Sequence, residues 1–404
     1  MKIPEEPANL EKELLKCVRC GSCKVLCPTY QHSALEVTSA RGRLVLLRGL
    51  LTGDIKPSPL LNERIFSCLL CGACAGKCPL GIDIPEAICH GRALLSKSDK
   101  ERKQLRTIAR FTTRWPDLSF KMLRMSQQVV LPFLYKKELI PFIPEFPEIV
   151  HRSRRQVYKS SQKRGRVAVF SGCSVEHLFP HLEEALIHVL NKLGYEVILP
   201  KGLVCCGAPL RTLGMEDESV ARARKNLSIL NKLTVEAVLS LCPTCTLTLK
   251  TDYPKMVGKG VENAMDISVF LNDKLEPARA AGKTAVYHDP CHLKYGLGIE
   301  REPREMITKA GLELIGPREQ GCCGFGGVFC MSQQEMSNTL LTACTTHLKQ
   351  SESDTVITSC PGCMLQLNRT VTDRPVLHLI ELIEETYCFG TADEDVQEKE
   401  KTQS

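Results

Sequence analysis

The chain has 404 residues and a formal net charge of +7, and hydrophobic residues make up 43% of it, which is typical of a globular protein with two or three domains. No apolar run approaches the roughly eighteen residues of a membrane span, and the acidic N-terminus lacks the basic and apolar segments of a secretory signal. Twenty-two cysteines in such a chain indicate metal ligation or redox chemistry rather than a disulfide framework. We therefore expect a cytoplasmic protein without a transmembrane segment.

The N-terminal region carries one cysteine motif twice. The pattern Cys-x2-Cys-x2-Cys-x3-Cys-Pro begins at Cys17 and recurs 51 residues later at Cys68. In two-cluster ferredoxins with this pattern, the fourth cysteine of each motif binds the cluster of the other motif. The predicted ligands of the first [4Fe–4S] cluster are Cys17, Cys20, Cys23 and Cys78. Those of the second cluster are Cys68, Cys71, Cys74 and Cys27.

Structural zinc is the alternative for these eight cysteines, because paired Cys-x2-Cys units also bind zinc. The complete order of spacings, present twice and followed each time by proline, favours two cubane clusters. We expect residues 1–96 to form a ferredoxin-type module around them.

Residues 97–165 are predicted to form a basic linker, first helical and then extended. Between Arg92 and Arg166 the chain has 19 Lys and Arg against 6 Asp and Glu. Aromatic residues interleaved with these charges are sparse, so a scaffold that binds nucleic acid is the weaker interpretation and we expect no nucleic-acid partner. We expect the segment to dock an acidic partner or an anionic membrane surface, which allows peripheral association with the inner face of the cell membrane.

The rest of the chain contains a second duplication. A single cysteine, a Cys-Cys-Gly triplet and a Cys-Pro-x-Cys segment recur at offsets of 117 or 118 residues. The first set is Cys173, Cys205, Cys206, Cys242 and Cys245. The second set is Cys291, Cys322, Cys323, Cys360 and Cys363. We assign the two copies to domains at 166–280 and 281–389, and predict that the acidic tail 390–404 is disordered.

Short apolar runs, which we read as strands, end just before four of these cysteines. The runs are Val167–Phe170, Val235–Leu241, Thr284–Tyr287 and Thr355–Thr358, and a helical pattern covers 182–193 before a strand at 195–199. Ligand sites of open α/β sheets lie beyond the carboxyl ends of the strands, so both cysteine sets are expected at such an edge.

These motifs resemble those of the iron–sulfur subunits of glycolate and lactate oxidising complexes and of heterodisulfide reductase subunits B and D. The resemblance covers nearly the whole chain and includes Arg41-Gly42-Arg43 between the ferredoxin motifs. It implies an α/β protein in which an N-terminal α-helical 2[4Fe–4S] ferredoxin-like module precedes two duplicated α/β cysteine-rich (CCG) domains. It also implies one or two further [4Fe–4S] clusters at the CCG sets, which are noncubane in the heterodisulfide reductase relatives. Zinc, or thiols that are simply packed, is the alternative at these sets.

Both CCG sets are complete here, whereas many glycolate oxidase subunits lack some of these cysteines. The segment His288-Asp289-Pro290-Cys291-His292 also matches the family, and His292 has two interpretations: a hydrogen-bond donor or proton carrier at a cluster, or, as we favour, a structural histidine. The cysteines outside the repeats are expected to be small buried residues. They are Cys89, Cys330, Cys344 and Cys388.

No dinucleotide or phosphate-binding motif occurs, since the glycine-rich segment 321–327 belongs to the second CCG set. Clusters without a hydride acceptor transfer single electrons and require a flavoprotein (FAD) partner. We expect the electron-transfer subunit of a flavin-dependent glycolate or lactate dehydrogenase, which passes electrons to a quinone or a further electron-transfer subunit. Such an oxidoreductase subunit is not catalytic alone on the hydroxy acid, and no catalytic residue is predicted. The alternative is a heterodisulfide reductase-like subunit whose CCG clusters reduce a disulfide.

Overall fold

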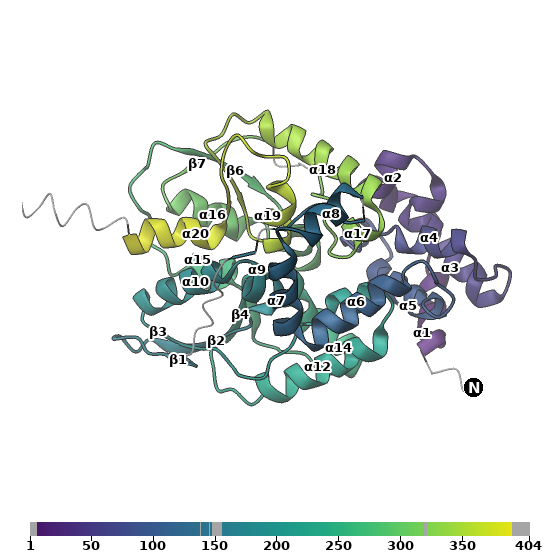
Figure 1. Cartoon of the computed structure of the whole chain (residues 1–404), viewed down its shortest axis with the longest axis horizontal. Coiled ribbons are helices and arrows are strands. Elements are labelled where there is room, and N and C mark those ends of the chain that lie inside the picture. The colour runs from purple at the N-terminus through teal and green to yellow at the C-terminus, as the bar shows by residue number, and fades with distance from the viewer. Residues whose placement is uncertain (1–5, 138, 145, 148–155, 318–320, 390–404) are drawn as a thin grey trace, which may run out of the picture.

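The computed structural model describes residues 6–137, 139–144, 146–147, 156–317 and 321–389. Figure 1 shows a group of N-terminal helices beside two α/β units, with three further helices crossing the front of the molecule where the units meet. The predicted disorder of 390–404 lies outside the described residues. No helix in the described ranges is long and apolar enough to cross a membrane.

The described part of the N-terminal module is helical. Its elements are α1 Glu6–Leu15, η1 Ser22–Lys24, α2 Pro28–Ser33, η2 Glu36–Thr38, α3 Ala40–Thr52, α4 Pro59–Phe66, η3 Ala75–Lys77 and α5 Ile84–Leu95. Side-chain caps begin α3 at Ser39, α4 at Ser58 and α5 at Asp83, where each side chain accepts a hydrogen bond from a backbone N–H of the first turn. Leu47 and Ile65 are fully buried in the core between these helices, which holds the cysteine-bearing turns in place.

Three helices follow, and they pack on the first α/β unit. They are α6 Lys103–Arg114, α7 Pro116–Ser126 and α8 Val130–Lys136. Pro116 begins α7, because proline at the first helical position loses no hydrogen bond. The ring of Phe120 on α7 stacks on His177 of the α/β unit, with 4.3 Å between ring centroids. Helices α6–α8 therefore lie across the junction of the two units (Figure 1).

The first α/β unit contains a five-stranded sheet in the order β1-β3-β2-β4-β5, parallel except for the antiparallel pair β1–β3. Its elements are β1 Val157–Tyr158, β2 Gly165–Val169, α9 Gly172–Leu178, α10 Pro180–Lys192, β3 Tyr195–Ile198, α11 Ala208–Thr212, α12 Glu216–Leu230, β4 Ala237–Ser240, α13 Pro243–Leu247, η4 Thr248–Asp252, α14 Tyr253–Val257, β5 Ala264–Asp266 and α15 Ile267–Asn272.

The second unit repeats this order with a four-stranded parallel sheet, β7-β6-β8-β9. Its elements are β6 Thr284–His288, η5 His292–Gly296, α16 Arg301–Lys309, β7 Glu313–Leu314, α17 Phe329–Ser332, α18 Gln334–Lys349, β8 Thr355–Thr358, α19 Pro361–Leu367, β9 Val376–His378, α20 Leu379–Glu384 and η6 Glu385–Phe389. The predicted α/β class and the strands before the four cysteines are confirmed.

One hydrophobic core joins the two units. It includes Leu239 of β4 and Ile357 of β8, and α10 of the first unit packs against α20 of the second. The imidazole Nε2 of His378 also lies 3.0 Å from the carbonyl oxygen of Leu241, just before Cys242. The carboxyl ends of β4 and β9 are therefore held close together. The exact domain boundaries stay predictions.

Candidate iron–sulfur sites and an adjoining cavity

The structure places the four cysteines predicted for the first cluster around one small cavity, and no other described cysteine lines it. They are Cys17, Cys20, Cys23 and Cys78. Gly21 has φ +90°, and a Cβ atom there would lie 3.2 Å from Nη1 of Arg41, so a larger residue would be strained. Four thiols facing one cavity are the donor set that a cubane cluster needs.

The other four cysteines of the module line a second cavity in the same way. They are Cys27, Cys68, Cys71 and Cys74. The turns are thus arranged so that the last cysteine of each motif lies with the first three of the other. Their assignment as ligands stays a prediction, and the residues present fit the two clusters.

Two buried arginines lie beside the second cavity. Arg43 donates hydrogen bonds to Thr29 and Ser67 through Nη2, at 2.9–3.1 Å. Arg92 donates to the carbonyl oxygens of Cys68 and Thr212, and burial lowers its pKa to about 10, so it is charged at neutral pH. These cations would offset the negative charge of a thiolate-ligated cluster. Neither role was predicted from the sequence, because nothing in an arginine-rich helix shows which guanidinium is buried.

The five thiols of the first CCG set form a continuous series of contacts. Hydrogen-bonding neighbours along it are Cys173 with Cys205, Cys205 with Cys206, Cys206 with Cys245, and Cys245 with Cys242. Cys173 lies in the first turn of α9, and Cys242 directly precedes α13, after β4. The sheet edge therefore gathers residues from three separate segments of the chain.

The second CCG set repeats this arrangement. The neighbours are Cys291 with Cys322, Cys322 with Cys323, Cys323 with Cys363, and Cys363 with Cys360, and the sulfur atoms of Cys323 and Cys363 are 3.4 Å apart. His288 distinguishes the second site from the first. Its ring is buried beside Cys323 and Cys363, and a ring nitrogen and the two sulfur atoms all lie within 4.8 Å of one another. In the first repeat Phe170 occupies the corresponding position. From the sequence, His288 was identified only as part of the segment that matches the family.

Hydrogen bonds within each set favour the thiolate, the form that binds metal, at some cysteines, and they raise the pKa of neighbours that share those bonds, such as Cys245 and Cys291. Contacts with Cys205 and Cys245 lower the pKa of Cys206 to about 5. In the second set, contacts with Cys291 and Cys323 lower the pKa of Cys322 well below its ordinary value.

The four thiol sets lie in a row whose order differs from their order in the sequence. The ferredoxin sites adjoin at Cys74, whose pKa is raised by burial and also by the charge of Cys23 across the boundary. Cys71 packs in an apolar cluster with Cys291 and Cys322 of the second CCG set. The two CCG sets meet where the thiols of Cys242 and Cys360 form a hydrogen bond. In the order of these contacts, the first CCG set is the last of the four when they are counted from the first ferredoxin site.

His292 lies where three of the sets meet. Its Nδ1 is 2.7 Å from the hydroxyl of Thr244 in the first Cys-Pro-x-Cys segment, and its Nε2 is 3.2 Å from the carbonyl oxygen of Leu70 in the ferredoxin module. Both ring nitrogens therefore hold protein groups together, which agrees with the structural interpretation. Cys89, Cys330 and Cys344 are buried, and Cys388 is partly buried.

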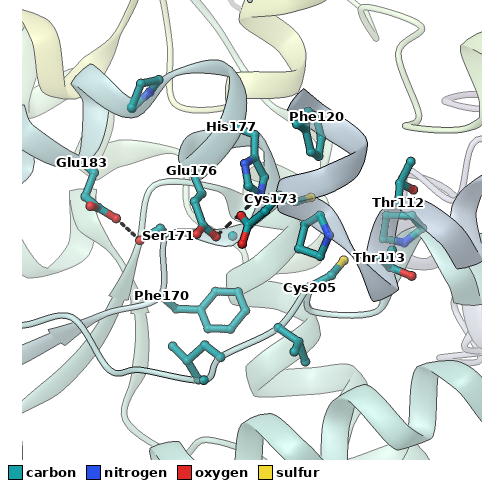
Figure 2. A pocket seen from close by; sticks show the side chains of 18 of the residues that line it. Thr112, Thr113, Phe120, Phe170, Ser171, Cys173, Glu176, His177, Glu183 and Cys205 are labelled. Atoms are coloured by element: carbon teal, nitrogen blue, oxygen red, sulfur yellow. Dashed lines mark hydrogen bonds and ion pairs between the residues drawn. The ribbon is translucent and has the colours of Figure 1, made fainter. Parts of the chain in front are cut away.

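A cavity of about 600 Å³ adjoins the first CCG set (Figure 2). Cys173 and Cys205 form part of its wall, together with side chains of α6, α7 and α9 and of the loop after β3. Figure 2 shows Glu176 and His177 beside Cys173, and Ser171 hydrogen-bonded to Glu183. Most of the lining is apolar, and the volume is that of sites for small organic molecules.

Comparison with known families supports this organisation. The model of the 4Fe-4S dicluster domain matches residues 13–82, and that of the cysteine-rich domain matches residues 167–250 and 285–368. Together these matches cover more than half of the chain. A crystal structure of a hypothetical protein from Helicobacter pylori has a similar fold, with a TM-score of 0.52 at 12% identity over 95% of this chain and 73% of that chain.

Curated relatives match along most of their length. The chain is 28% identical to one of the subunits of the CoM/CoB fumarate reductase of Methanothermobacter marburgensis, over 96% of this chain and 75% of the relative. It is 27% identical to the probable glycolate oxidase iron–sulfur subunit of Bacillus subtilis, over 88% of this chain and 89% of the relative. It is also 27% identical to one of the subunits of the dihydromethanophenazine:CoB–CoM heterodisulfide reductase of Methanosarcina barkeri, over 94% of this chain and 95% of the relative. The chain therefore belongs to the family of iron–sulfur oxidoreductase subunits in which a 4Fe-4S dicluster domain precedes two cysteine-rich CCG domains, and it carries multiple [4Fe–4S] clusters.

Proposed function

We propose that this protein is the electron-transfer subunit of a flavin-dependent 2-hydroxy acid dehydrogenase that oxidises glycolate or lactate. The observation that carries the proposal is the row of four thiol sets, which runs from the first ferredoxin site to the cavity beside the first CCG set. When bound, the clusters supply one-electron redox centres. The residues of the chain would hold the clusters one after another along this row. The buried cysteines would shield the clusters from solvent.

The first ferredoxin site is the proposed entry for electrons, because Cys20 is exposed there. Exposed apolar side chains lie along the chain on both sides of its cysteines, as expected of a surface that a partner covers. They are Leu15, Val18, Val25 and Leu80, exposed by 44–69%. We define them as the entry surface and propose that the FAD-containing subunit docks on it.

The test is co-expression with candidate flavoproteins of the 2-hydroxy acid dehydrogenase class. A stable complex that reduces an artificial dye with glycolate or lactate is the expected result. Failure of every such flavoprotein to associate with the chain would reject the proposal.

A second function is favoured by the two complete CCG sets of five cysteines each. The two sets meet at the contact between Cys242 and Cys360. In this alternative the CCG clusters reduce a disulfide, as the name of the heterodisulfide reductase relative suggests for that protein. Disulfide-dependent oxidation of a reduced viologen by the purified, cluster-loaded chain would support it. Inactivity with low-molecular-weight disulfides would leave the dehydrogenase proposal as the better one.

We further propose that the protein works in the cytoplasm at the inner face of the membrane, attached by helices α6–α8. Half of the twenty large hydrophobic side chains that are exposed in the described structure belong to residues 108–139. Basic residues accompany them, and helices of this kind bind the interface of anionic membranes. We call the exposed apolar residues and their basic neighbours the apolar–basic surface. It comprises Trp115, Leu118, Met122, Met125, Val129 and Phe133, with Arg114, Lys121, Arg124 and Lys136.

A further inference from the structure

The cavity beside Cys173 lies at the far end of the row of thiol sets, where nothing in the proposed function yet uses it. Its volume of about 600 Å³ contrasts with about 20 Å³ at each ferredoxin site. The turns at the two ferredoxin sites thus leave little free space, whereas the cavity beside Cys173 has room for a small organic molecule.

We propose that this cavity binds a neutral quinone, which accepts the electrons that reach the first CCG set. This inference rests on the proposed function, because the electrons originate at the flavoprotein. The quinone takes up two electrons, delivered one at a time, and two protons from water. Its two C=O groups become C–OH groups, and no other bond is broken.

The charges around the cavity favour a neutral ligand over an anionic one. Among the described residues that line it, Asp117, Glu176 and Glu183 carry carboxyl groups and Lys201 alone carries an ammonium group. A carboxylate substrate would meet this acidic excess at short range, where like charges repel strongly because little water separates them. The cavity is therefore unsuited to a 2-hydroxy acid and suited to an apolar ring with two carbonyl groups.

The polar groups of the cavity suit a ligand that gains protons as it is reduced. Ser171 donates a hydrogen bond to Glu183, and the burial of Glu183 raises the pKa of its carboxyl group. A carboxyl group that is easily protonated can pass a proton to a reduced quinone oxygen. His177 and Phe120 stack at the same wall, which offers an aromatic surface beside the proposed ring.

Access to the cavity is also appropriate for a lipid-soluble molecule. Ile108 lines the cavity and is 57% exposed, so the cavity reaches the surface at α6. Pro116 and Phe120 of α7 form the same wall, and α7 bears much of the apolar–basic surface. A quinone dissolved in a membrane could thus pass from the lipid interface to the first CCG set.

The first test fills the cavity. Thr112 lines it from α6, so Thr112→Trp should occupy much of its volume, while Thr107→Trp alters an exposed position on the same helix that does not line it. Binding of menadione to the oxidised, cluster-loaded protein is measured by equilibrium dialysis, and reoxidation of the reduced protein is followed by rapid mixing. We expect Thr112→Trp to weaken menadione binding and to slow reoxidation by menadione at least tenfold, with the Thr107→Trp protein unchanged. Failure of the wild type to bind menadione, or equal binding by both variants, would overturn the proposal.

A second pair of variants tests the proton path without changing the volume. Glu183→Gln should slow reoxidation by menadione but not by ferricyanide, which takes one electron and no proton, whereas Glu184→Gln on the exposed side of α10 should affect neither. Equal menadione rates in the two variants would remove Glu183 from the proposal. A chain that binds a flavoprotein and reduces ferricyanide but does not bind menadione would refute the quinone site alone. A chain that binds menadione but no flavoprotein would instead refute the dehydrogenase function.

Discussion

Nδ1 of His292 lies 2.7 Å from the hydroxyl oxygen of Thr244, which joins the second CCG domain to the Cys-Pro-x-Cys segment of the first. The other ring nitrogen contacts Leu70 of the ferredoxin module, so a single side chain fixes three neighbouring cysteine sites. Electron transfer between the sites depends on their separation, and this contact is one of those that set it.

His292→Leu should therefore lower the free energy of unfolding of the cluster-loaded protein by about 1–3 kcal/mol. The substitution removes both hydrogen bonds and leaves the hydroxyl of Thr244 and the carbonyl oxygen of Leu70 without the imidazole as a partner. Thermal unfolding would measure the change. His188→Leu removes an exposed ion pair with Glu384 and should cost less than about 1 kcal/mol. Equal losses in the two variants would argue against the joining role of His292.

Crosswise ligation predicts which cysteine substitutions share a phenotype. Cys78→Ser should change the electron paramagnetic resonance spectrum of the reduced protein in the same way as Cys17→Ser, since both cysteines line the first cavity. Cys27→Ser should instead match Cys68→Ser at the second cavity. A Cys78→Ser spectrum that matched Cys68→Ser would contradict the arrangement.

Arg43 should raise the reduction potential of the second ferredoxin cluster. A buried cation stabilises the more negative, reduced cluster, so Arg43→Gln should lower the potential by tens of millivolts, where about 59 mV corresponds to a tenfold change for one electron. A redox titration would measure this. Arg48→Gln, at an exposed position of the same helix, is the control and should leave the potential unchanged. A fall of the same size in both variants would show that burial of the charge is unimportant.

Arg211 should stabilise the contact between the ferredoxin module and the first CCG domain. It is 4% exposed and forms ion pairs with Glu86, Glu216 and Asp252. Arg211→Met leaves these carboxylates without their shared cation, and we expect a loss of about 3–5 kcal/mol in the free energy of unfolding.

Denaturant unfolding would measure the effect of Arg211→Met. Its control is Arg110→Met, because the Arg110–Glu218 ion pair is largely exposed and should contribute no more than about 1 kcal/mol. A small loss for Arg211→Met would mean that the carboxylates find other partners.

Docking of the flavoprotein at the entry surface can be tested at Val18, which is 69% exposed between Cys17 and Cys20. Val18→Asp places a charge in a surface that must lose water on association, so the dissociation constant should rise at least tenfold. The iron content should stay unchanged. Leu60→Asp on α4 changes an equally apolar, 59% exposed side chain outside the entry surface and should bind normally. Analytical ultracentrifugation of each mixture would reveal a loss of binding in either variant.

The sequence by itself determined the two kinds of cysteine motif and the duplicated architecture. Spacing alone separates the ferredoxin motifs from the CCG sets, because each kind of motif has its own intervals between cysteines and each is present twice. The strands before Cys242 and Cys360 were also predictable, since the apolar runs there are short and continuous.

Only the tertiary structure decided the order of the sites and the position of the cavity. Although the first CCG set follows the ferredoxin module in the chain, the second set is its neighbour, through the packing of Cys71 with Cys322. That contact depends on how the two α/β units share one core, and residue spacing carries no information about it. The same holds for the cavity beside Cys173, whose wall includes α6 and α7 from a segment that the sequence showed only as a basic linker.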